Sequence, residues 1–469
     1  MIRSIVKFTC GDAPSKAPDS SRALARDGFS DALGVMVAGT VMPVARNLLA
    51  WIRSRRGPGE ARVWLSAEHA SVAHAALVGT AAAHALDYDD YAYSNHVSAV
   101  LVPPILAEAE RQGADGSSMV KAYLVGFEVW GALFKAEPDH LHSKGWHPTG
   151  VFGPLGVAAA LCHLRGVDES VCTSALGLAA ASGGGVMDNF GFQAKPWQGA
   201  RAAEAGVTAV ELACAGLDAG PDAVDGSGGL LAALSPEGRV KRKDPLPGLG
   251  SAWLSAGPAL NLKCHPTVGA SQRAIDAAIE LHGRDDFQLG QVDTVTARVS
   301  EKHAAVMRLH RPLTASEARF SLEFCVAAGL LVGRVGLREL SDEFVGREDV
   351  QALLRRVRIE TGPDDDPSYP VGARYDTVRV RLKDGRTLES DRVYRFRGHG
   401  DNPLSEDELE HKFLECCVPV LGESPSLALW RAVRRLDELE STEAFPVLNY
   451  RTLARPSSVS STPATASRD

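Results

Sequence analysis

Four segments of the chain place ionisable side chains within apolar sequence, and each could take part in acid–base chemistry. In the first, three crowded carboxylates, Asp87, Asp89 and Asp90, lie between His84 and His96. Crowding raises the pKa of some carboxylates and favours the charged form of a neighbouring imidazole. The alternative interpretation is a helix C-terminus followed by a solvated acidic loop. A metal site is a third interpretation, although the spacing matches no standard set of ligands.

The second segment, GWHPTGVFGPLG, places His147 and Thr149 directly before an expected helix rich in alanine and glycine. The start of a helix presents free N–H groups and a partial positive charge, so a substrate carboxylate could bind there beside the imidazole. The alternative is that Thr149 only caps the helix.

The third and fourth segments each contribute a lysine. Lys195 precedes a helix of small residues and has aromatic neighbours, which favours a partly buried ammonium group able to hold a carboxylate. An ordinary surface lysine is the alternative. Lys263 and His265 precede another expected helix, and the alternative there is a turn between domains around Pro266.

Taken together, these side chains suit the removal of a proton from a carbon next to a carboxylate. Such a proton is very weakly acidic, so a base must remove it while cations or N–H dipoles stabilise the developing negative charge. A second acid then protonates a leaving hydroxyl or the carbanion. Two histidines and two lysines that converge in space would supply these roles.

The elements that must position these residues are mostly helices. Residues 20–218 are rich in Ala, Gly, Leu and Val at helical spacing, with small residues that let helices pack closely, and no convincing strand is expected there. Ser405 and Glu408 form a capping box that opens further helices extending to about residue 440.

The pattern changes in the third quarter of the chain. VDTVTARVS (292–300) alternates as a strand does, VRIETG (357–362) could be another strand, and VRVRL before Asp384-Gly385 predicts a hairpin. The predicted architecture is mainly α. A large all-helical domain (1–260 plus 404–450) carries an inserted α+β lid domain (261–403), and the polar residues 455–469 form a disordered tail.

Composition narrows the class of protein. The 469 residues have a formal net charge of −8, which argues against a nucleic-acid partner. The eight cysteines are scattered without CxxC spacing, which favours buried thiols in a reducing compartment. Neither a signal peptide nor an apolar run of membrane-spanning length is expected, so the prediction is a cytoplasmic protein without a membrane partner.

The ordered series of segments resembles the MmgE/PrpD family, which includes 2-methylcitrate dehydratase, cis-aconitate decarboxylase and iminodisuccinate epimerase. The similarity covers roughly residues 20–450 and includes HALDYDDY, GWHPTGVFGPLG, NFGFQAKPWQGARAAEAGV, RPLTASEARFSLEF and DNPLSEDELEHKF. It implies a homodimer with an active site between the helical and lid domains, without metal or other cofactor.

The resemblance also implies roles for particular residues. Family active-site positions correspond to Asp87, His96, His147 and Lys195, which we predict to be catalytic. The predicted substrate-binding residues are Tyr91, Thr149, Lys263 and His265.

Four positions depart from the family pattern. Family members commonly have Cys or His where this chain has Val268, and His where it has Gln272. Tyr91 stands in place of the usual threonine, and His265 in place of an aromatic residue.

The predicted function is therefore that of a cofactor-independent lyase, a dehydratase or decarboxylase, acting on a small di- or tricarboxylic acid. One alternative is an epimerase on the same scaffold, with acid–base groups on opposite faces of one carbon. Another is a non-catalytic binding protein derived from the family, which the altered segment 263–272 motivates.

Overall fold

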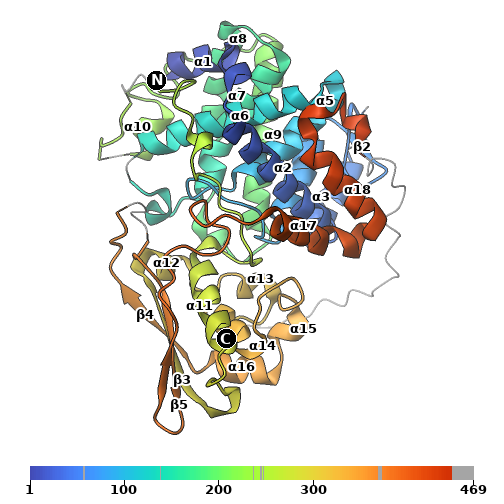
Figure 1. Ribbon diagram of the computed structural model, residues 1–469. Helices are drawn as coiled ribbons and strands as arrows, with labels where there is room; N and C mark the ends of the chain where they lie inside the picture. Colours follow the sequence, from blue (N-terminus) through green and yellow to red (C-terminus); the bar gives the residue numbers. More distant parts are fainter. Residues whose placement is uncertain are drawn as a thin grey trace.

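The computed structural model describes residues 1–55, 59–137, 139–235, 237–242, 246, 248–367 and 372–445. The tail predicted at 455–469 lies outside these residues. Two parts are visible in Figure 1, a large helical part above and a smaller part below in which helices pack on a sheet. The prediction of a mainly helical fold is confirmed.

Among the residues that the structure describes, the helical part has ten α-helices from the first half of the chain and two from its end. They are α1 (Ile2–Cys10), α2 (Asp19–Gly39), α3 (Pro43–Arg53), α4 (Val72–His84), α5 (Val97–Gln112), α6 (Gly116–Ala136), α7 (Pro148–Arg165), α8 (Glu169–Ala180), α9 (Ala194–Cys214), α10 (Leu230–Leu234), α17 (Glu406–Leu421) and α18 (Glu423–Arg434). The two C-terminal helices pack back onto α2, far from them in sequence. The predicted capping box of Ser405 and Glu408 opens α17.

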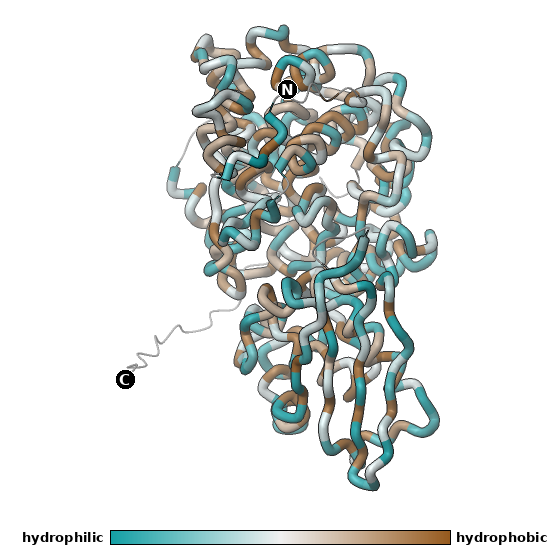
Figure 2. The backbone as a smooth tube through the Cα atoms, turned by 90° about the vertical axis from the view of Figure 1, so that its left-hand side faces the viewer, coloured by the Kyte–Doolittle hydropathy of each residue, from teal (hydrophilic) through white to brown (hydrophobic). Residues whose placement is uncertain are grey.

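The α+β part carries a four-stranded sheet in the order β4-β3-β5-β6. Its strands are β3 (Val292–Ser300), β4 (Val357–Gly362), β5 (Thr377–Leu382) and β6 (Thr387–Glu389). β3 pairs in parallel with β4 and antiparallel with β5, which forms the predicted hairpin with β6. The strands alternate in hydropathy in Figure 2, because one face packs on helices.

The described residues of this part also form six α-helices: α11 (Gln272–His282), α12 (Glu301–Val306), α13 (Ala315–Ala318), α14 (Leu322–Val332), α15 (Asp342–Val345) and α16 (Glu348–Leu354). Buried apolar residues between Ala270 and Leu388 form its core. A separate core joins the residues of 2–262 with those of 409–445. A small cluster of Met187, Phe190 and Phe320 packs where the two parts meet.

Two details differ from expectation. A pair of two-residue strands, β1 (Ala61–Arg62) and β2 (His69–Ala70), lies within the stretch predicted to have none. They are too short for a period-two pattern to be detected in sequence. No single helix of the described residues is long and apolar enough to cross a membrane, although α2 and α3, bent by 79°, pass such a test as a pair.

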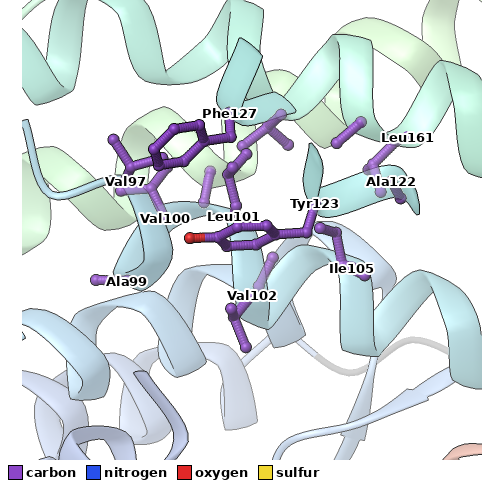
Figure 3. Packing of buried hydrophobic residues seen from close by; sticks show 14 of the residues in the cluster. Val97, Ala99, Val100, Leu101, Val102, Ile105, Ala122, Tyr123, Phe127 and Leu161 are labelled. Atoms are coloured by element: carbon purple, nitrogen blue, oxygen red, sulfur yellow. The ribbon is translucent and has the colours of Figure 1, made fainter. Parts of the chain in front are cut away.

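Close packing in the helical core fixes the helices that carry the candidate residues. α5 starts directly after His96, and its apolar residues pack against Tyr123 and Phe127 of α6, as Figure 3 shows. The Tyr123 hydroxyl lies 2.7 Å from Ser98 Oγ in the first turn of α5. The start of α5, and with it His96, is thereby held against the core.

Candidate active site

The turn between α4 and α5 carries the crowded carboxylates, and it is buried. Asp87 is 3% exposed, and Asp89 and Asp90 are fully buried, so the alternative of a solvated acidic loop is wrong. Asp87 has a left-handed backbone conformation with φ of 49°, which is uncommon for a residue other than glycine. This strained residue turns its side chain toward two lysines.

Lys195, the second residue of α9, is the centre of the site. Its Nζ lies 3.1 Å from His84 Nε2, 3.3 Å from His96 Nε2 and 3.2 Å from Asp87 Oδ2. The ammonium group can donate to both imidazole nitrogens while its charge is paired with the Asp87 carboxylate. The alternative of a surface lysine is wrong, because Lys195 is only 3% exposed.

Asp89 holds both imidazoles in one orientation. Its Oδ1 lies 3.1 Å from His84 Nδ1, and its Oδ2 lies 2.8 Å from His96 Nδ1. Because an ionised carboxylate only accepts, each Nδ1 carries a proton and each Nε2 keeps a lone pair. That tautomer is the one that accepts from the Lys195 ammonium.

Lys263 balances the charge of the cluster. Its Nζ donates to Asp87 Oδ1 and to the Asp87 carbonyl, each at 2.7 Å, and its side chain is fully buried. Two lysines therefore face two aspartates, which limits the penalty of burying four charges together.

The pKa values follow from this burial. Burial lowers the pKa of Lys195, although the neighbouring Asp87 opposes the change. Burial alone would raise the pKa of Asp87, but the ammonium groups of Lys195 and Lys263 hold it well below its usual value. Burial, His84 and Lys195 lower the pKa of His96 to about 3, so this imidazole is neutral near pH 7.

His147 lies behind the cluster, at the start of α7. Its Nδ1 is 3.0 Å from Gln198 Nε2, and its buried Nε2 has no hydrogen-bond partner among the described residues. Thr149 does not cap α7 as the alternative interpretation proposed. Its Oγ1 instead accepts a hydrogen bond of 3.1 Å from the backbone N–H of His96. The starts of α5, α7 and α9 therefore meet at one point, and their dipoles favour negative charge there.

The same atoms have the geometry of a metal site. The ligand nitrogens of His84, His96 and His147 lie within 4.8 Å of one another. However, the Lys195 ammonium approaches two of these imidazoles at hydrogen-bond distance, in the position that a cation would otherwise take. The residues therefore fit an internal ammonium group, which supplies the positive charge itself.

A cavity of about 130 Å³ opens beside the cluster, between the helical and α+β parts. Its inner end is formed by His96, Lys195 and Lys263, and its apolar walls include Phe190 and Val268. Its remaining polar lining residues are Tyr91, Ser94, His140, His142, Ser143, Lys302 and His303. Several of these also line a larger neighbouring space of about 950 Å³.

The structure brings most of the predicted residues together, but not all. Asp87, His96, His147, Lys195 and Lys263 converge, and Tyr91 lines the cavity. Thr149 is fully buried behind His96 and is not among the residues that line this cavity.

His265 does not lie at this cavity. Its Nδ1 is 3.0 Å from the Val335 carbonyl and its Nε2 is 3.2 Å from Asp276 Oδ1, so both ring nitrogens have partners elsewhere. The side chain lines a different pocket, next to α17. The assignment of His265 to substrate binding therefore has no support from its position.

Sequence reasoning included His84 and Asp89 in the acidic segment but did not predict them to be catalytic. It missed Gln198, which lies one turn after Lys195. The signal in the sequence that could have indicated Asp89 was its alternation with Asp87, since both residues point to one side of the turn. Lys302 and His303 carry no signal in sequence, because only the packing of the α+β part brings them to the cavity.

Comparisons with known proteins identify the family of the chain. The MmgE/PrpD N-terminal domain matches residues 3–243 and the MmgE/PrpD C-terminal domain matches residues 265–438. The cis-aconitate decarboxylase of Mus musculus is 30% identical over 430 residues, 87% of this chain and 85% of that protein. The human cis-aconitate decarboxylase is 31% identical over 390 residues, 80% and 79% of the two chains.

A third relative, a cis-aconitate decarboxylase-like protein of Aspergillus oryzae, is 29% identical over 375 residues, 74% of this chain and 76% of its own. The two family models together cover nearly all of the helices and strands described above. The chain therefore belongs to the MmgE/PrpD family.

Proposed function

We propose that the protein is a lyase that acts on a small di- or tricarboxylic acid by moving a proton at a carbon next to a carboxylate. The observation that carries this proposal is the position of Lys195 at the inner end of the cavity, between two neutral imidazoles and an ionised carboxylate. Such an arrangement offers a cation, a proton donor and lone-pair acceptors within 3.1 to 3.3 Å of Lys195 Nζ.

The relatives support the same class of reaction. The mouse and human proteins are named cis-aconitate decarboxylases, and the alignments extend over most of each chain. Decarboxylation next to a double bond and dehydration both pass through a carbanion-like species. Either reaction requires stabilisation of negative charge near a carboxylate and transfer of one proton.

The residues divide this work in a defined way. The ammonium groups of Lys195 and Lys263 stabilise negative charge on a substrate carboxylate, after a substrate oxygen replaces one acceptor of Lys195. His96 lines the cavity and its unprotonated Nε2 faces Lys195, so it accepts or returns the proton once a substrate oxygen takes its place as an acceptor of Lys195. Asp89 keeps its tautomer fixed, and His84 and His147 lie behind it and exclude water.

A further cation in the wall of the cavity suits a second carboxylate. Lys302, from α12, lines the cavity together with the imidazoles of His140 and His142. Its ammonium group is 3.6 Å from Asp364 and its side chain is 41% exposed, so a substrate carboxylate can approach it. We propose that this wall binds the group farther from the reacting carbon.

We expect Lys302→Met to raise the KM for a dicarboxylic substrate by about tenfold, as for a lost charged hydrogen bond, and to leave kcat within about twofold. Lys383→Met, on the exposed hairpin, is the matched control. An unchanged KM in the Lys302 variant would exclude a carboxylate at that wall.

The function is tested by incubating the purified protein with citrate-like, aconitate-like and aspartate-like acids in deuterated water and following the products by NMR. Loss of CO2 or of water together with deuterium incorporation supports the proposal. Deuterium exchange with inversion and no other product indicates an epimerase. If no acid is converted while one of them binds, the protein is a binding protein and the proposal is wrong.

A further inference from the structure

Three consecutive backbone carbonyls of the turn between α4 and α5 each accept from a different buried cation. Arg319 Nε donates to the Leu86 carbonyl at 2.9 Å. Lys263 Nζ donates to the Asp87 carbonyl at 2.7 Å, and Lys412 Nζ donates to the Tyr88 carbonyl at 2.9 Å. Such a sequence of contacts is unusual, because backbone carbonyls are most often paired with backbone N–H groups.

The three cations come from distant parts of the chain. Arg319 lies between α13 and α14 of the α+β part, Lys263 lies in the segment that enters that part, and Lys412 lies on α17. They are 4%, 0% and 5% exposed. Burying a charge is unfavourable unless the group finds strong partners. The burial of three cations beside this turn therefore indicates that the turn needs their hydrogen bonds.

The turn also needs external support. Asp87 has the left-handed backbone conformation, which persists in a residue other than glycine only where the surroundings impose it. On the side of the turn away from the cavity, Asp31 Oδ2 accepts from the backbone N–H of Asp90 at 2.7 Å. Asp31 is itself paired with Lys412.

Arg319 further joins the turn to the wall of the cavity. Its backbone carbonyl accepts from the Val268 N–H at 3.1 Å, and Val268 lines the cavity. Among the described residues no carboxylate lies within ion-pair distance of the Arg319 guanidinium. Its hydrogen bond to the turn is therefore its principal polar contact across the boundary between the two parts.

We infer that Arg319 and Lys412 are positioning residues that hold the turn in the conformation that directs Asp87 and Asp89 into the site. Arg319 makes this support depend on docking of the α+β part, so the carboxylates that orient Lys195 and His96 are set only when the two parts are together. The kinetic half of the test below rests on the proposed function, whereas the exchange half does not.

The first measurement is backbone amide hydrogen exchange of the protein without substrate. We expect Arg319→Met and Lys412→Met to speed exchange in residues 86–96 at least about tenfold, while exchange in β3 stays unchanged. Arg347→Met, an exposed arginine of the same part that pairs with Asp349, is the matched control. Equal exchange in residues 86–96 of all variants, or an equal rise throughout the chain, would overturn the inference.

The second measurement is turnover per folded molecule with the acid found to be a substrate. We expect kcat to fall by about 10- to 100-fold in Arg319→Met with KM within about threefold, because misplaced groups slow the chemical step more than they weaken binding. Arg319→Lys, which keeps one donor, should recover part of kcat. A variant with lowered thermal stability but an unchanged kcat per folded molecule would show a merely structural role and refute the inference.

The two measurements separate the two proposals. If the unaltered protein converts no acid, the proposed function fails, and amide exchange still decides whether these residues hold the turn. If the unaltered protein is active and both readouts are unchanged in Arg319→Met and Lys412→Met, only the positioning role fails.

Discussion

At the scale of single residues, the site is organised by one buried ammonium group. Because Lys195 is buried, water does not stabilise its charge, and Asp87 and two imidazole lone pairs do so instead. The imidazoles in turn stay neutral because protonation would place further positive charge beside Lys195 in a buried site. The charge state of each group therefore depends on its neighbours.

Removal of the ammonium group should affect both chemistry and titration. We expect Lys195→Met to lower kcat/KM at least about 100-fold, as for loss of a charged group that stabilises a transition state. The pKa values of His84 and His96 should rise, because Lys195 contributes to lowering both. NMR titration of the imidazoles measures this shift. Unchanged imidazole pKa values would contradict the charge coupling even if activity were lost.

At the scale of elements, the site depends on helices that start at the same point. The start of α7 approaches the segment 183–185 so closely that Gly150 has no room for a side chain. A Cβ on Gly150 would lie 1.9 Å from the carbonyl oxygen of Gly184. The same segment accepts the His147 N–H through Gly185 at 3.0 Å. Small residues in these helices thus allow close packing and also fix the position of the His147 imidazole.

Gly150→Ala tests this close approach. The substitution forces the segment 183–185 away from α7, so we expect a loss of about 1–3 kcal/mol in the free energy of unfolding, as for overpacking, together with a lower kcat. Urea unfolding and turnover measure the two effects. Gly184→Ala is the matched control, since an added Cβ there meets nothing within 4 Å. Equal stability of the two variants would contradict the steric argument.

At the scale of the whole molecule, the cavity lies between two separately packed cores. Burial around it holds several imidazoles neutral, with pKa values lowered to about 3 for His96 and His303 and to about 4 for His140. The unfolded chain binds protons at these histidines below about pH 6.5, whereas the folded chain does not. The free energy of unfolding therefore decreases as the pH is lowered across this range.

We expect the urea midpoint to fall as the pH is lowered from 7 to 5. Each such histidine contributes up to about 1.4 kcal/mol per pH unit between its unfolded and folded pKa values. Carboxylates with raised pKa values work in the opposite direction, as Asp376 does, whose pKa burial raises to about 6. Among the described residues, however, the eight histidines with lowered pKa values outnumber the six carboxylates with raised ones. His303→Gln should reduce the slope. A midpoint that is unchanged or higher at pH 5 would contradict this account.

The protein also exposes a group of large apolar side chains near the start of α9. Trp51, Phe192 and Trp197 are 39%, 61% and 43% exposed, and Asn47 of α3 bonds Gln193 at 3.0 Å, so α3 and the segment before α9 are adjacent. Exposed aromatic residues gathered in this way are typical of protein interfaces. We propose that a second copy of the chain covers this surface.

Light scattering on eluted protein tests the proposed dimer. We expect the unaltered chain to elute as a dimer and Trp51→Glu to shift it toward the monomer, because a charge would be buried at the interface. Leu289→Glu is the control, since Leu289 is 37% exposed on the α+β part, two residues from Gln291, whose carbonyl accepts from Lys383 of the hairpin of β5 and β6. A monomeric unaltered chain, or a Trp51 variant that remains dimeric, would refute this interface.

The sequence by itself determined the class of each element. Helical spacing predicted the long helices, and strict alternation predicted β3 with its observed bounds and the hairpin of β5 and β6, because these periods follow from local backbone geometry. The resemblance of ordered motifs identified the family. It also pointed to Asp87, His96, His147 and Lys195, which do converge.

Only the tertiary structure decided the partners of these residues. Lys195 meets His84 from 111 positions away, and Lys263 meets Asp87 from 176 positions away. Packing of separate helices sets such contacts, and no local pattern encodes them. Proximity in sequence to Lys263 suggested that His265 binds substrate, but His265, two residues away, faces another pocket. Neighbours in an irregular segment share no fixed direction, so the surrounding fold selects which side chain enters the cavity.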